Sequence, residues 1–203
     1  MAVGIRKRQA AETEAELKAA AVRTFARLGY LNTKITDITA EAGRAAGSFY
    51  THFANKEALL EALLADLLAE GDAAVVEPGH SDDFRDRAAV RWHVAVYWNF
   101  YRRRQTILVA LQQAAIVDPS FARRSQELME PDLRHIAGHL ERLELPGDPL
   151  VVASMITTLM SAFADVWLSG RGPGLGRELP DEEAIETLTS FLYAGIGGER
   201  SAG

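Results

Sequence analysis

Residues 35–60 read ITDITAEAGRAAGSFYTHFANKEALL, and this stretch is the most informative part of the sequence about its structure. Ile35, Ile38 and Ala42 recur at the spacing that places apolar residues on one face of a short helix. Gly43 follows at the point where a helix commonly ends on a residue with left-handed backbone angles. The pattern therefore predicts a first short helix that ends in a tight turn at this glycine.

A second short helix is expected over residues 45–53, because Phe49 and Phe53 are four residues apart and share its inner face. A third helix begins at Asn55, a residue type that caps helix N-termini, and turns a row of leucines inward. Two short helices joined by a glycine-containing turn are typical of the helix-turn-helix motif, whose second helix enters the major groove of DNA.

The same stretch resembles the DNA-binding signature of the tetracycline-repressor (TetR) family of bacterial regulators. The residues that carry the resemblance are Phe25, Gly29, Tyr30, Thr33, Ile35, Asp37, Ile38, Ala42, Gly43, Gly47, Phe49, Tyr50, His52, Phe53, Lys56, Glu57 and Leu60. The resemblance implies an all-α fold of about nine helices, with a three-helix DNA-binding head at residues 1–70 and a ligand-binding and dimerisation body at residues 71–203. It also implies a homodimer that pairs the last two helices of each subunit.

The start of the recognition helix departs from the family pattern. Arg44 and Ala45 stand where the family usually has a small apolar residue followed by Ser or Thr. The N-cap hydroxyl is therefore missing, a loss that commonly costs about 1 kcal/mol of helix stability. Ala46 stands where a basic or polar residue is frequent, so we expect few base contacts from this first turn and expect Arg44 to take over part of them.

The composition is that of a soluble globular protein, because 48% of the 203 residues are hydrophobic and 25% are charged. The absence of cysteine excludes disulfides and thiolate metal sites. The N-terminus has no apolar segment of the secretory type, and no apolar run is expected to span a membrane. We therefore expect a cytoplasmic protein.

The net charge of −6 is divided unevenly along the chain. Residues 1–56 contain nine Lys or Arg and five Asp or Glu, whereas residues 57–203 contain 13 and 23, which gives net charges of +4 and −10. A basic head is attracted to phosphate and an acidic body is repelled by it.

Within the head, the basic segment Ile5–Arg8 is either an arm that reaches DNA or a solvated tail. Thr13–Glu16 fits a capping box, which predicts that the first helix starts there.

The body is expected to be helical throughout, after a boundary in the glycine- and proline-containing residues 71–83. The expected helices cover residues 84–103, 105–117, 118–143 and 150–168, followed by a last helix capped by Asp181. Asp118 followed by Pro119 is a strong helix start, whereas Pro131 is expected to kink or split the helix that contains it.

Nine residues of the head are candidates for DNA contact. By the resemblance, Thr36, Tyr50, His52 and Lys56 hold phosphates, Arg44, Ser48 and Thr51 lie nearest the base edges, and Ala45 and Ala46 belong to the first turn of the recognition helix. Lys56 also falls at a helix N-terminus, where free N–H groups favour an anion. The alternative for His52 is a packed structural histidine, and the alternative for Tyr50 and Lys56 is a purely structural role.

Eight residues of the body are candidates for ligand contact: Trp92, His93, Val96, Asn99, Gln112, Phe163, Asp165 and Trp167. Together they would form an apolar wall with a few polar groups, and Gln113 would add one more polar group. Such a wall is typical of a pocket for a small, largely apolar molecule. A buried His93 or Asn99 needs hydrogen-bond partners, so the alternative is a filled core in which these side chains bond within the protein. Asp165 could instead face solvent or a partner subunit.

We expect no metal site, no cofactor and no enzyme activity. Asp132, His135 and His139 share a helix face, but the Glu that a zinc-protease motif places after the first His is missing, so we expect a solvated face. Residues 43–48 lack the lysine and the spacing of a phosphate-binding loop, and no G-x-S-x-G nucleophile motif occurs.

The sequence therefore predicts a homodimeric DNA-binding regulator, a repressor that leaves a palindromic operator when a small apolar ligand binds the body. Ligand binding would tilt the helix over residues 55–70 and move the two heads out of register with successive grooves. The alternative from another class is a small-molecule-binding or catalytic helical protein whose head is vestigial, which the sparse first turn of the recognition helix favours.

Overall fold

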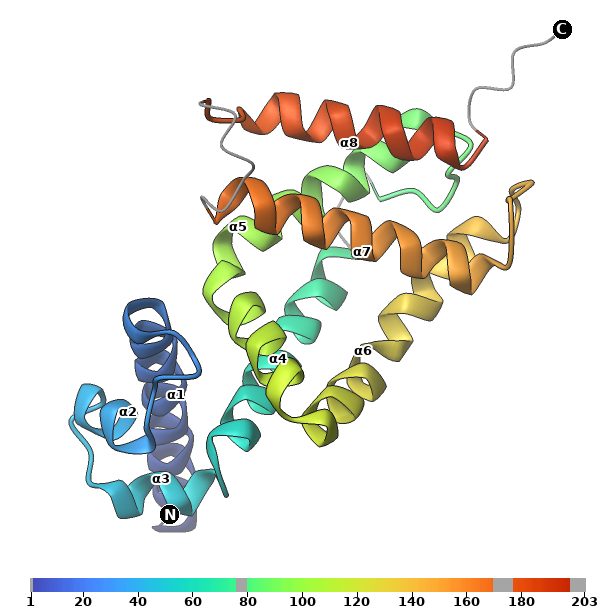
Figure 1. Cartoon of the computed structure of the whole chain (residues 1–203). Helices are drawn as coiled ribbons and strands as arrows, with labels where there is room; N and C mark the ends of the chain where they lie inside the picture. The colour runs from blue at the N-terminus through green and yellow to red at the C-terminus, as the bar shows by residue number, and fades with distance from the viewer. Residues whose placement is uncertain (1, 76–79, 170–176, 198–203) are drawn as a thin grey trace, which may run out of the picture. The chain divides into compact units, whose positions relative to one another are not determined.

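The computed structural model describes residues 2–75, 80–169 and 177–197, and these residues form helices and no strand (Figure 1). The helices are α1 (Ala2–Leu28), α2 (Ile35–Glu41), α3 (Ala46–His52), α4 (Lys56–Val75), α5 (Arg87–Val117), α6 (Pro119–Leu140), α7 (Pro149–Leu168) and α8 (Asp181–Gly195). The predicted all-α class is confirmed. The count is close to the expected one, because the segments predicted over residues 84–103 and 105–117 form the single helix α5.

Helix α1 begins at Ala2, whereas the sequence pattern predicts a start at Thr13. Thr13 is not an N-cap, because its Oγ1 donates to the carbonyl oxygen of Gln9 at 3.0 Å, a bond within the helix. Residues 2–12 are rich in alanine, arginine and other strong helix formers and contain no proline, so nothing interrupts the helix. The basic segment Ile5–Arg8 is therefore helical rather than an extended arm or a tail.

Helix α6 runs without interruption through Pro131 to Leu140, so the expected split does not occur. The proline removes one backbone hydrogen bond, and the helix continues on both sides of it. The start of α6 is as predicted, since Oδ1 of Asp118 accepts from the backbone N–H groups of Ser120 at 2.8 Å and Phe121 at 3.1 Å.

Helix α8 does not use Asp181 as its N-cap, although the sequence predicts one there. The N-cap residue is Pro180, which makes no side-chain cap bond. The carboxylate of Asp181 instead accepts from the indole Nε1 of Trp98 at 2.7 Å and from the guanidinium of Arg102. This acidic residue therefore joins the start of α8 to the middle of α5.

The chain packs as two compact units. The first unit contains the residues up to Leu67 together with Thr106–Glu127, and the second contains Leu68–Gln105 and the residues from Leu128 on. Helices α4, α5 and α6 each contribute residues to both units. Gly71, the first residue of the expected boundary at residues 71–83, lies inside α4. Helices α1, α2 and α3 therefore share one packed unit with the end of α5 and the start of α6.

The core of the first unit is made of apolar side chains from five helices. These side chains are Leu17, Phe25, Ile38, Phe49, Leu59, Leu60, Leu63, Leu64 and Phe121, and each is at most 5% exposed. The predicted inward row of leucines in α4 is confirmed. Full burial of such a side chain contributes roughly 1.5–3 kcal/mol, so this shared core fixes the positions of the short helices α2 and α3.

The core of the second unit forms around two aromatic residues of α5. Trp98 and Tyr101 are fully buried. The ring of Trp98 lies 5.9 Å from that of Phe163 on α7, and the hydroxyl of Tyr101 donates to Oδ1 of Asp165 at 3.1 Å. Because Trp98 also bonds Asp181, α5 is the element that α7 and α8 both contact.

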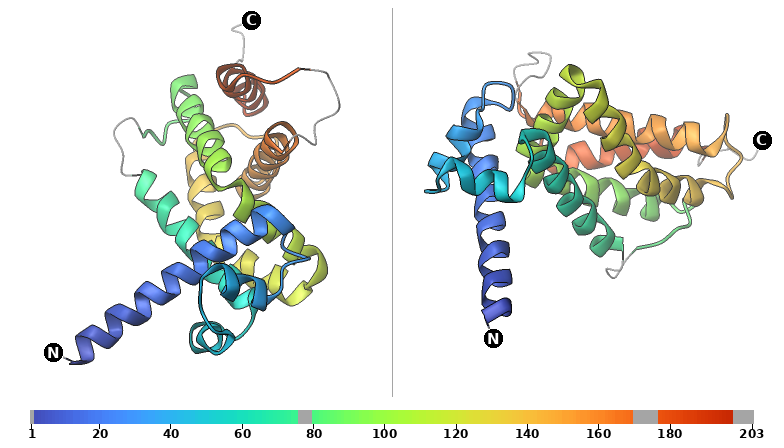
Figure 2. Two further views of the ribbon diagram at one scale, coloured as in Figure 1. Left: turned by 90° about the vertical axis from the view of Figure 1, so that its left-hand side faces the viewer. Right: turned by 90° about the horizontal axis from the view of Figure 1, so that it is seen from below.

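One face of α7 is apolar and exposed. This helix is long and apolar enough to cross a membrane by length and composition alone, contrary to the expectation that no run reaches that length. Val151 and Met155 are 56% and 64% exposed, and Thr158 and Ala162 continue the same exposed face. Helix α8 runs beside α7 in Figures 1 and 2, and its Phe191 is 66% exposed. Two neighbouring helices therefore carry large apolar side chains that their own unit does not cover.

Candidate nucleic-acid interface

Hydrogen bonds hold both ends of α2. Gly43, which follows it, has a φ of 64°, in the left-handed region where glycine has no side-chain clash, as the sequence predicts. The backbone N–H of Arg44 donates to the carbonyl oxygen of Thr39 at 2.8 Å and closes the turn into α3. At the other end, the carboxylate of Asp37 accepts from the backbone N–H of Lys34 at 2.8 Å and fixes the start of the helix.

Helix α3 has one anchored face and one open face. Phe49 is fully buried, with its ring centroid 5.6 Å from that of Phe53. The next residue, Tyr50, is 60% exposed. The exposed residues of α3 and its N-cap are Ala45, Ala46, Gly47, Tyr50 and Thr51. Ala45 makes no side-chain cap bond, as predicted, so the open face begins with small side chains.

Gly47 is the second residue of α3, and the fold does not require a glycine there. A Cβ built on Gly47 meets no heavy atom within 4 Å, and its φ is not positive. Glycine inside a helix costs about 0.5–1 kcal/mol of stability relative to alanine. The missing side chain instead leaves the backbone of α3 open to close approach from outside.

Arg44, expected near base edges, is paired with Glu16 of α1. Its Nε donates to Oε2 of Glu16 at 2.9 Å, and the two side chains are 41% and 49% exposed. Arg23 of α1 and Glu41 of α2 form a similar pair at 2.7 Å, and the hydrogen bond from Arg23 lowers the pKa of Glu41. Exposed pairs of this kind contribute about 0–1 kcal/mol, so a nucleic-acid phosphate or base would compete readily for Arg44.

Lys56, expected to hold a phosphate, is tied to the turn that follows α1. Its Nζ donates to the carbonyl oxygens of Tyr30 at 2.7 Å and Thr33 at 2.9 Å, and lies 4.0 Å from the centre of the Tyr30 ring. Burial lowers the pKa of Lys56. Because an ammonium group has three N–H donors, these bonds leave one donor for a phosphate.

Tyr30 links the same turn to two other helices. Its hydroxyl donates to Oε1 of Glu57 at 2.8 Å, and its backbone N–H donates to Oε1 of Gln113 on α5 at 3.1 Å. Burial, followed by the hydrogen bond and the charge of Glu57, raises the pKa of the Tyr30 phenol far above its usual value. Sequence reasoning placed Gln113 in the ligand wall and missed this bond, because no local pattern predicts a contact between residues 83 positions apart.

The other candidates for DNA contact lie on exposed or half-buried faces of α2 and α3. Thr36 is exposed in the first turn of α2, and Ser48 and His52 are half-buried on α3. Thr51 is exposed, and its Oγ1 donates to the carbonyl oxygen of Gly47 at 3.2 Å. The contacts that these side chains make with DNA stay predictions.

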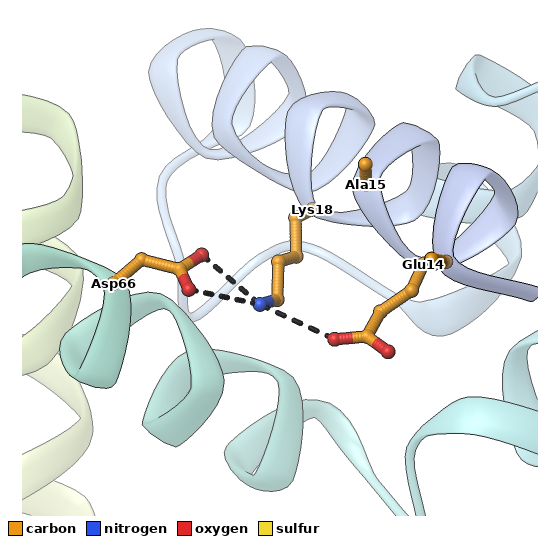
Figure 3. A pocket seen from close by; sticks show the side chains of 5 residues that line it. Glu14, Ala15, Lys18 and Asp66 are labelled. Atoms are coloured by element: carbon orange, nitrogen blue, oxygen red, sulfur yellow. Dashed lines mark hydrogen bonds and ion pairs between the residues drawn. The ribbon is translucent and has the colours of Figure 1, made fainter. Parts of the chain in front are cut away.

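A hollow between α1 and α4 is lined by two carboxylates, Glu14 and Asp66, which repel anions (Figure 3). Nζ of Lys18 bonds both carboxylate oxygens of Asp66, at 3.1 and 3.0 Å, and lies 3.3 Å from Oε1 of Glu14. Burial alone would lower the pKa of Lys18, but the hydrogen bonds and charges of these two carboxylates raise it. The hollow therefore serves to join α1 to α4 within the first unit.

Most of the candidate ligand residues are half-buried in the second unit, namely Trp92, His93, Val96, Phe163, Asp165 and Trp167. Asn99 is exposed, contrary to the expectation of a buried polar group, and its Nδ2 donates to the carbonyl oxygen of Ala95 at 2.9 Å. The buried face of α5 runs through Val94, Trp98 and Tyr101, and Asn99 lies off it. Gln112 is also exposed and belongs to the part of α5 in the first unit. The pocket itself stays a prediction.

The prediction that this face of α6 is solvated is wrong for His139. That residue is 6% exposed, whereas His135 is exposed and Asp132 half-buried. The ring of His139 stacks on that of Phe84, with centroids 5.1 Å apart and an angle of 19° between the planes. Helix periodicity correctly places the three residues on one face, but it does not predict that the segment before α5 covers part of that face.

The sequence matches a known family over the helix-turn-helix. The model of a family described as bacterial regulatory proteins, tetR family, matches residues 17–63. Over 80 residues the chain is 39% identical to the probable HTH-type transcriptional regulator ArpR of Pseudomonas putida. The matched stretch covers 39% of this chain and 38% of that relative, so well under half of the relative is compared.

Solved structures resemble this chain over almost its whole length. The fatty acid degradation regulator FadR from Bacillus halodurans has a TM-score of 0.73 at 18% identity, covering 92% of this chain and 96% of that one. The transcriptional regulator FadR from Bacillus subtilis, in complex with stearoyl-CoA, has a TM-score of 0.67 at 15% identity, covering 92% and 99%. At such identities the likeness shows a shared fold.

Proposed function

This chain belongs to the tetracycline-repressor (TetR) family of bacterial regulators, and we propose that it is a DNA-binding transcriptional repressor released from its operator by a small, largely apolar ligand. It acts in the cytoplasm as a homodimer on a palindromic duplex. It is a regulator and not an enzyme, and its proposed action requires no cofactor.

The observation that carries the proposal is the open face of α3. Phe49 anchors the helix in the core, while Tyr50 extends into solvent on the other side. Gly47 leaves the backbone of that face bare at a cost in helix stability that nothing inside the protein demands. A surface that a partner approaches closely accounts for both features, and the major groove of DNA is such a partner for the second helix of a helix-turn-helix.

We assign different roles to the basic and polar residues around α3. Tyr50 and Thr36 are exposed and contact phosphates, which position the protein without reading sequence. Ser48 and Thr51 lie nearest the base edges. Arg44 also contacts the base edges. Its guanidinium leaves Glu16 to do so, which is possible because both side chains of this ion pair are partly exposed. Lys56 acts chiefly by fixing the turn before α2, with one N–H donor left for phosphate.

The dimer would form through the exposed faces of α7 and α8. A homodimer interface resembles a protein core cut in two and is rich in apolar side chains. Val151, Met155 and Phe191 are large apolar residues that their own unit leaves exposed. Thr158 and Ala162 add a flat strip on which a partner helix can pack closely. The apolar character of α7 then reflects a partner subunit rather than a lipid bilayer.

The ligand would act through helices that belong to both units. A ligand changes DNA affinity only if it prefers one of two conformations of the protein. Because α4, α5 and α6 are continuous between the units, a shift of the body reaches the head along the backbone. The half-buried wall of Trp92, Val96 and Phe163 supports an apolar ligand. FadR from Bacillus subtilis, which shares the fold, binds stearoyl-CoA, a molecule with a long apolar chain.

A second candidate function is a small-molecule-binding helical protein with a vestigial head. Two features favour it: the first turn of α3 offers alanine and glycine, and Arg44 and Lys56 both have partners within the protein. It predicts no salt-dependent affinity for DNA, which separates it from the proposed repressor.

The proposal is tested by retention of the protein on an immobilised random-sequence duplex that is washed with rising salt. A repressor is retained at low salt and released as salt rises, because phosphate contacts displace counterions. Arg44→Ala should weaken retention at low salt, because it removes a positive charge from the face that approaches the duplex. Arg134→Ala is the matched control, since Arg134 is also exposed and paired with a glutamate but lies on α6 in the second unit. Equal effects of the two changes, or no retention at low salt, would contradict the proposal.

A further inference from the structure

Four of the chain's five histidines meet inside the second unit. His80 comes from the segment before α5, His93 from α5, and His135 and His139 from α6. Ring nitrogens of His80, His93 and His139 all lie within 4.8 Å of one another, and Nε2 of His135 is 3.2 Å from Nε2 of His139. We propose that this histidine cluster binds one divalent first-row transition-metal ion, such as Zn²⁺, through imidazole nitrogens.

His93 is held in the form that a metal requires. Its Nδ1 lies 2.9 Å from the carbonyl oxygen of Ala89, and since a carbonyl can only accept, Nδ1 carries the proton. The lone pair is therefore on Nε2, which is buried and has no hydrogen-bond partner among the described residues. A backbone carbonyl that orients the outer nitrogen of a histidine is the usual support of a metal ligand.

The other rings of the cluster add further nitrogens. Nε2 of His80 is also buried and without a hydrogen-bond partner in the described part of the chain. Nε2 of His139 lies 3.2 Å from Nε2 of His135, at hydrogen-bond distance, so the proton between them is released when both nitrogens bind an ion. Buried polar atoms are almost always paired, so two unpaired nitrogens in one cluster call for a shared partner. One cation at the centre satisfies both.

The spacing fits a tetrahedral ion after small movements of side chains. Zinc binds histidine nitrogen at roughly 2.0–2.1 Å, which places two tetrahedral ligands about 3.4 Å apart. The nitrogens of His135 and His139 are at 3.2 Å, and the separations among His80, His93 and His139, which are within 4.8 Å, close by rotation of the rings. His135 is exposed and provides the route by which an ion enters.

The surroundings favour a transition metal over a hard cation. The donor set is made of imidazoles, which suit zinc, copper and nickel, whereas magnesium and calcium require oxygen ligands. Trp92 and Phe84 pack edge-on against His80 and His93, at 5.3 and 4.8 Å between ring centroids, and form an apolar wall. Burial lowers the pKa of His93 to about 4, so this ring is neutral at pH 7, in agreement with the proton position set by Ala89.

The test uses the full chain without a purification tag, stripped of metal with a chelator and dialysed. Titration with Co²⁺ should give the intense visible absorption of a tetrahedral site and saturate at one ion per chain, and Zn²⁺ should displace it. His93→Gln and His80→Gln should each weaken binding at least tenfold. His52→Gln, which changes the one histidine outside the cluster, should leave binding unchanged.

Two results would overturn the inference. One is the absence of saturable Co²⁺ and Zn²⁺ binding by the unaltered chain. The other is a loss of binding in His135→Gln and His139→Gln but not in His80→Gln or His93→Gln, which would reveal a surface chelate made by α6 alone. Circular dichroism checks that each variant is folded. If His93→Gln does not fold, the metal binding of His80→Gln tests the inference alone, because His80 lies outside the helices. The result is independent of whether the protein binds DNA.

Discussion

Nζ of Lys56 donates to the carbonyl oxygen of Tyr30 at 2.7 Å and lies 4.0 Å from the centre of the Tyr30 ring. The same ammonium group bonds Thr33, so the first residue of α4 closes the turn that leads into α2. A lysine that the family resemblance predicts to hold a phosphate thus has a structural role as well, and the two roles are separable by experiment.

Lys56→Ala should lower the free energy of unfolding by roughly 1–3 kcal/mol, because it removes a donor from the carbonyl groups of Tyr30 and Thr33, and the first of these keeps the backbone N–H of Thr33 at 3.2 Å. Lys34→Ala is the control: Lys34 is exposed, and such changes usually stay within about 0.5 kcal/mol. Urea denaturation followed by circular dichroism measures both. The structural role is excluded if the two variants unfold at the same urea concentration.

Gly47→Ala should separate stability from function. Alanine fits at this position without a clash, so the variant should be more stable by about 0.5–1 kcal/mol while binding duplex DNA more weakly. Gly71→Ala provides the comparison, since Gly71 is also helical and also has open space around its Cβ, but lies on α4 in the second unit. It should gain stability without loss of DNA affinity. Thermal unfolding and a gel-shift titration of both variants test this, and undiminished DNA binding by Gly47→Ala would remove α3 from the interface.

The helix-turn-helix was predictable from sequence because its determinants are local. Gly43 adopts the positive φ expected of a helix end, Phe49 is buried at the expected spacing, and Asn55 caps α4 by accepting from the N–H of Ala58 at 2.7 Å. Each of these depends on residues within one helical turn. Local chemistry therefore carries most of the information about this part of the fold.

The partners of the candidate site residues were not predictable, because they come from distant parts of the chain. Arg44 is paired across 28 positions with Glu16, and Tyr30 is bonded across 83 positions to Gln113. The histidine cluster was missed for the same reason, since the pair on α6 is visible in the sequence but its burial depends on a segment some fifty residues earlier. Asn99 shows the opposite error: aromatic neighbours in sequence suggested burial, whereas its own side of α5 is exposed.

Tyr50→Phe should weaken binding to specific and random duplexes by similar factors. The hydroxyl is assigned to phosphate, which carries no sequence information directly, so its loss cannot change base preference. Stability should change by less than about 0.5 kcal/mol, because Tyr50 is 60% exposed. Equilibrium titrations of a duplex selected from a random library and of an unselected duplex provide the comparison. A change in the selected sequence with unaltered affinity for random DNA would assign Tyr50 to base contact instead.

Met155→Lys should convert the protein to a monomer at micromolar concentration. Met155 is 64% exposed on α7, so a lysine there is harmless in a single subunit but would place an unpaired charge in the centre of an apolar dimer interface. Ile116→Lys is the control for an exposed apolar residue elsewhere, since Ile116 is 82% exposed on α5 in the first unit. Light scattering after size-exclusion chromatography should give the mass of a dimer for the unaltered chain and for Ile116→Lys, and of one chain for Met155→Lys. The DNA affinity of Met155→Lys should fall steeply when the dimer is lost, because a palindromic site is then bound by one head at a time. A dimeric Met155→Lys would move the interface away from this face of α7, and a monomeric unaltered chain would contradict the proposed assembly altogether.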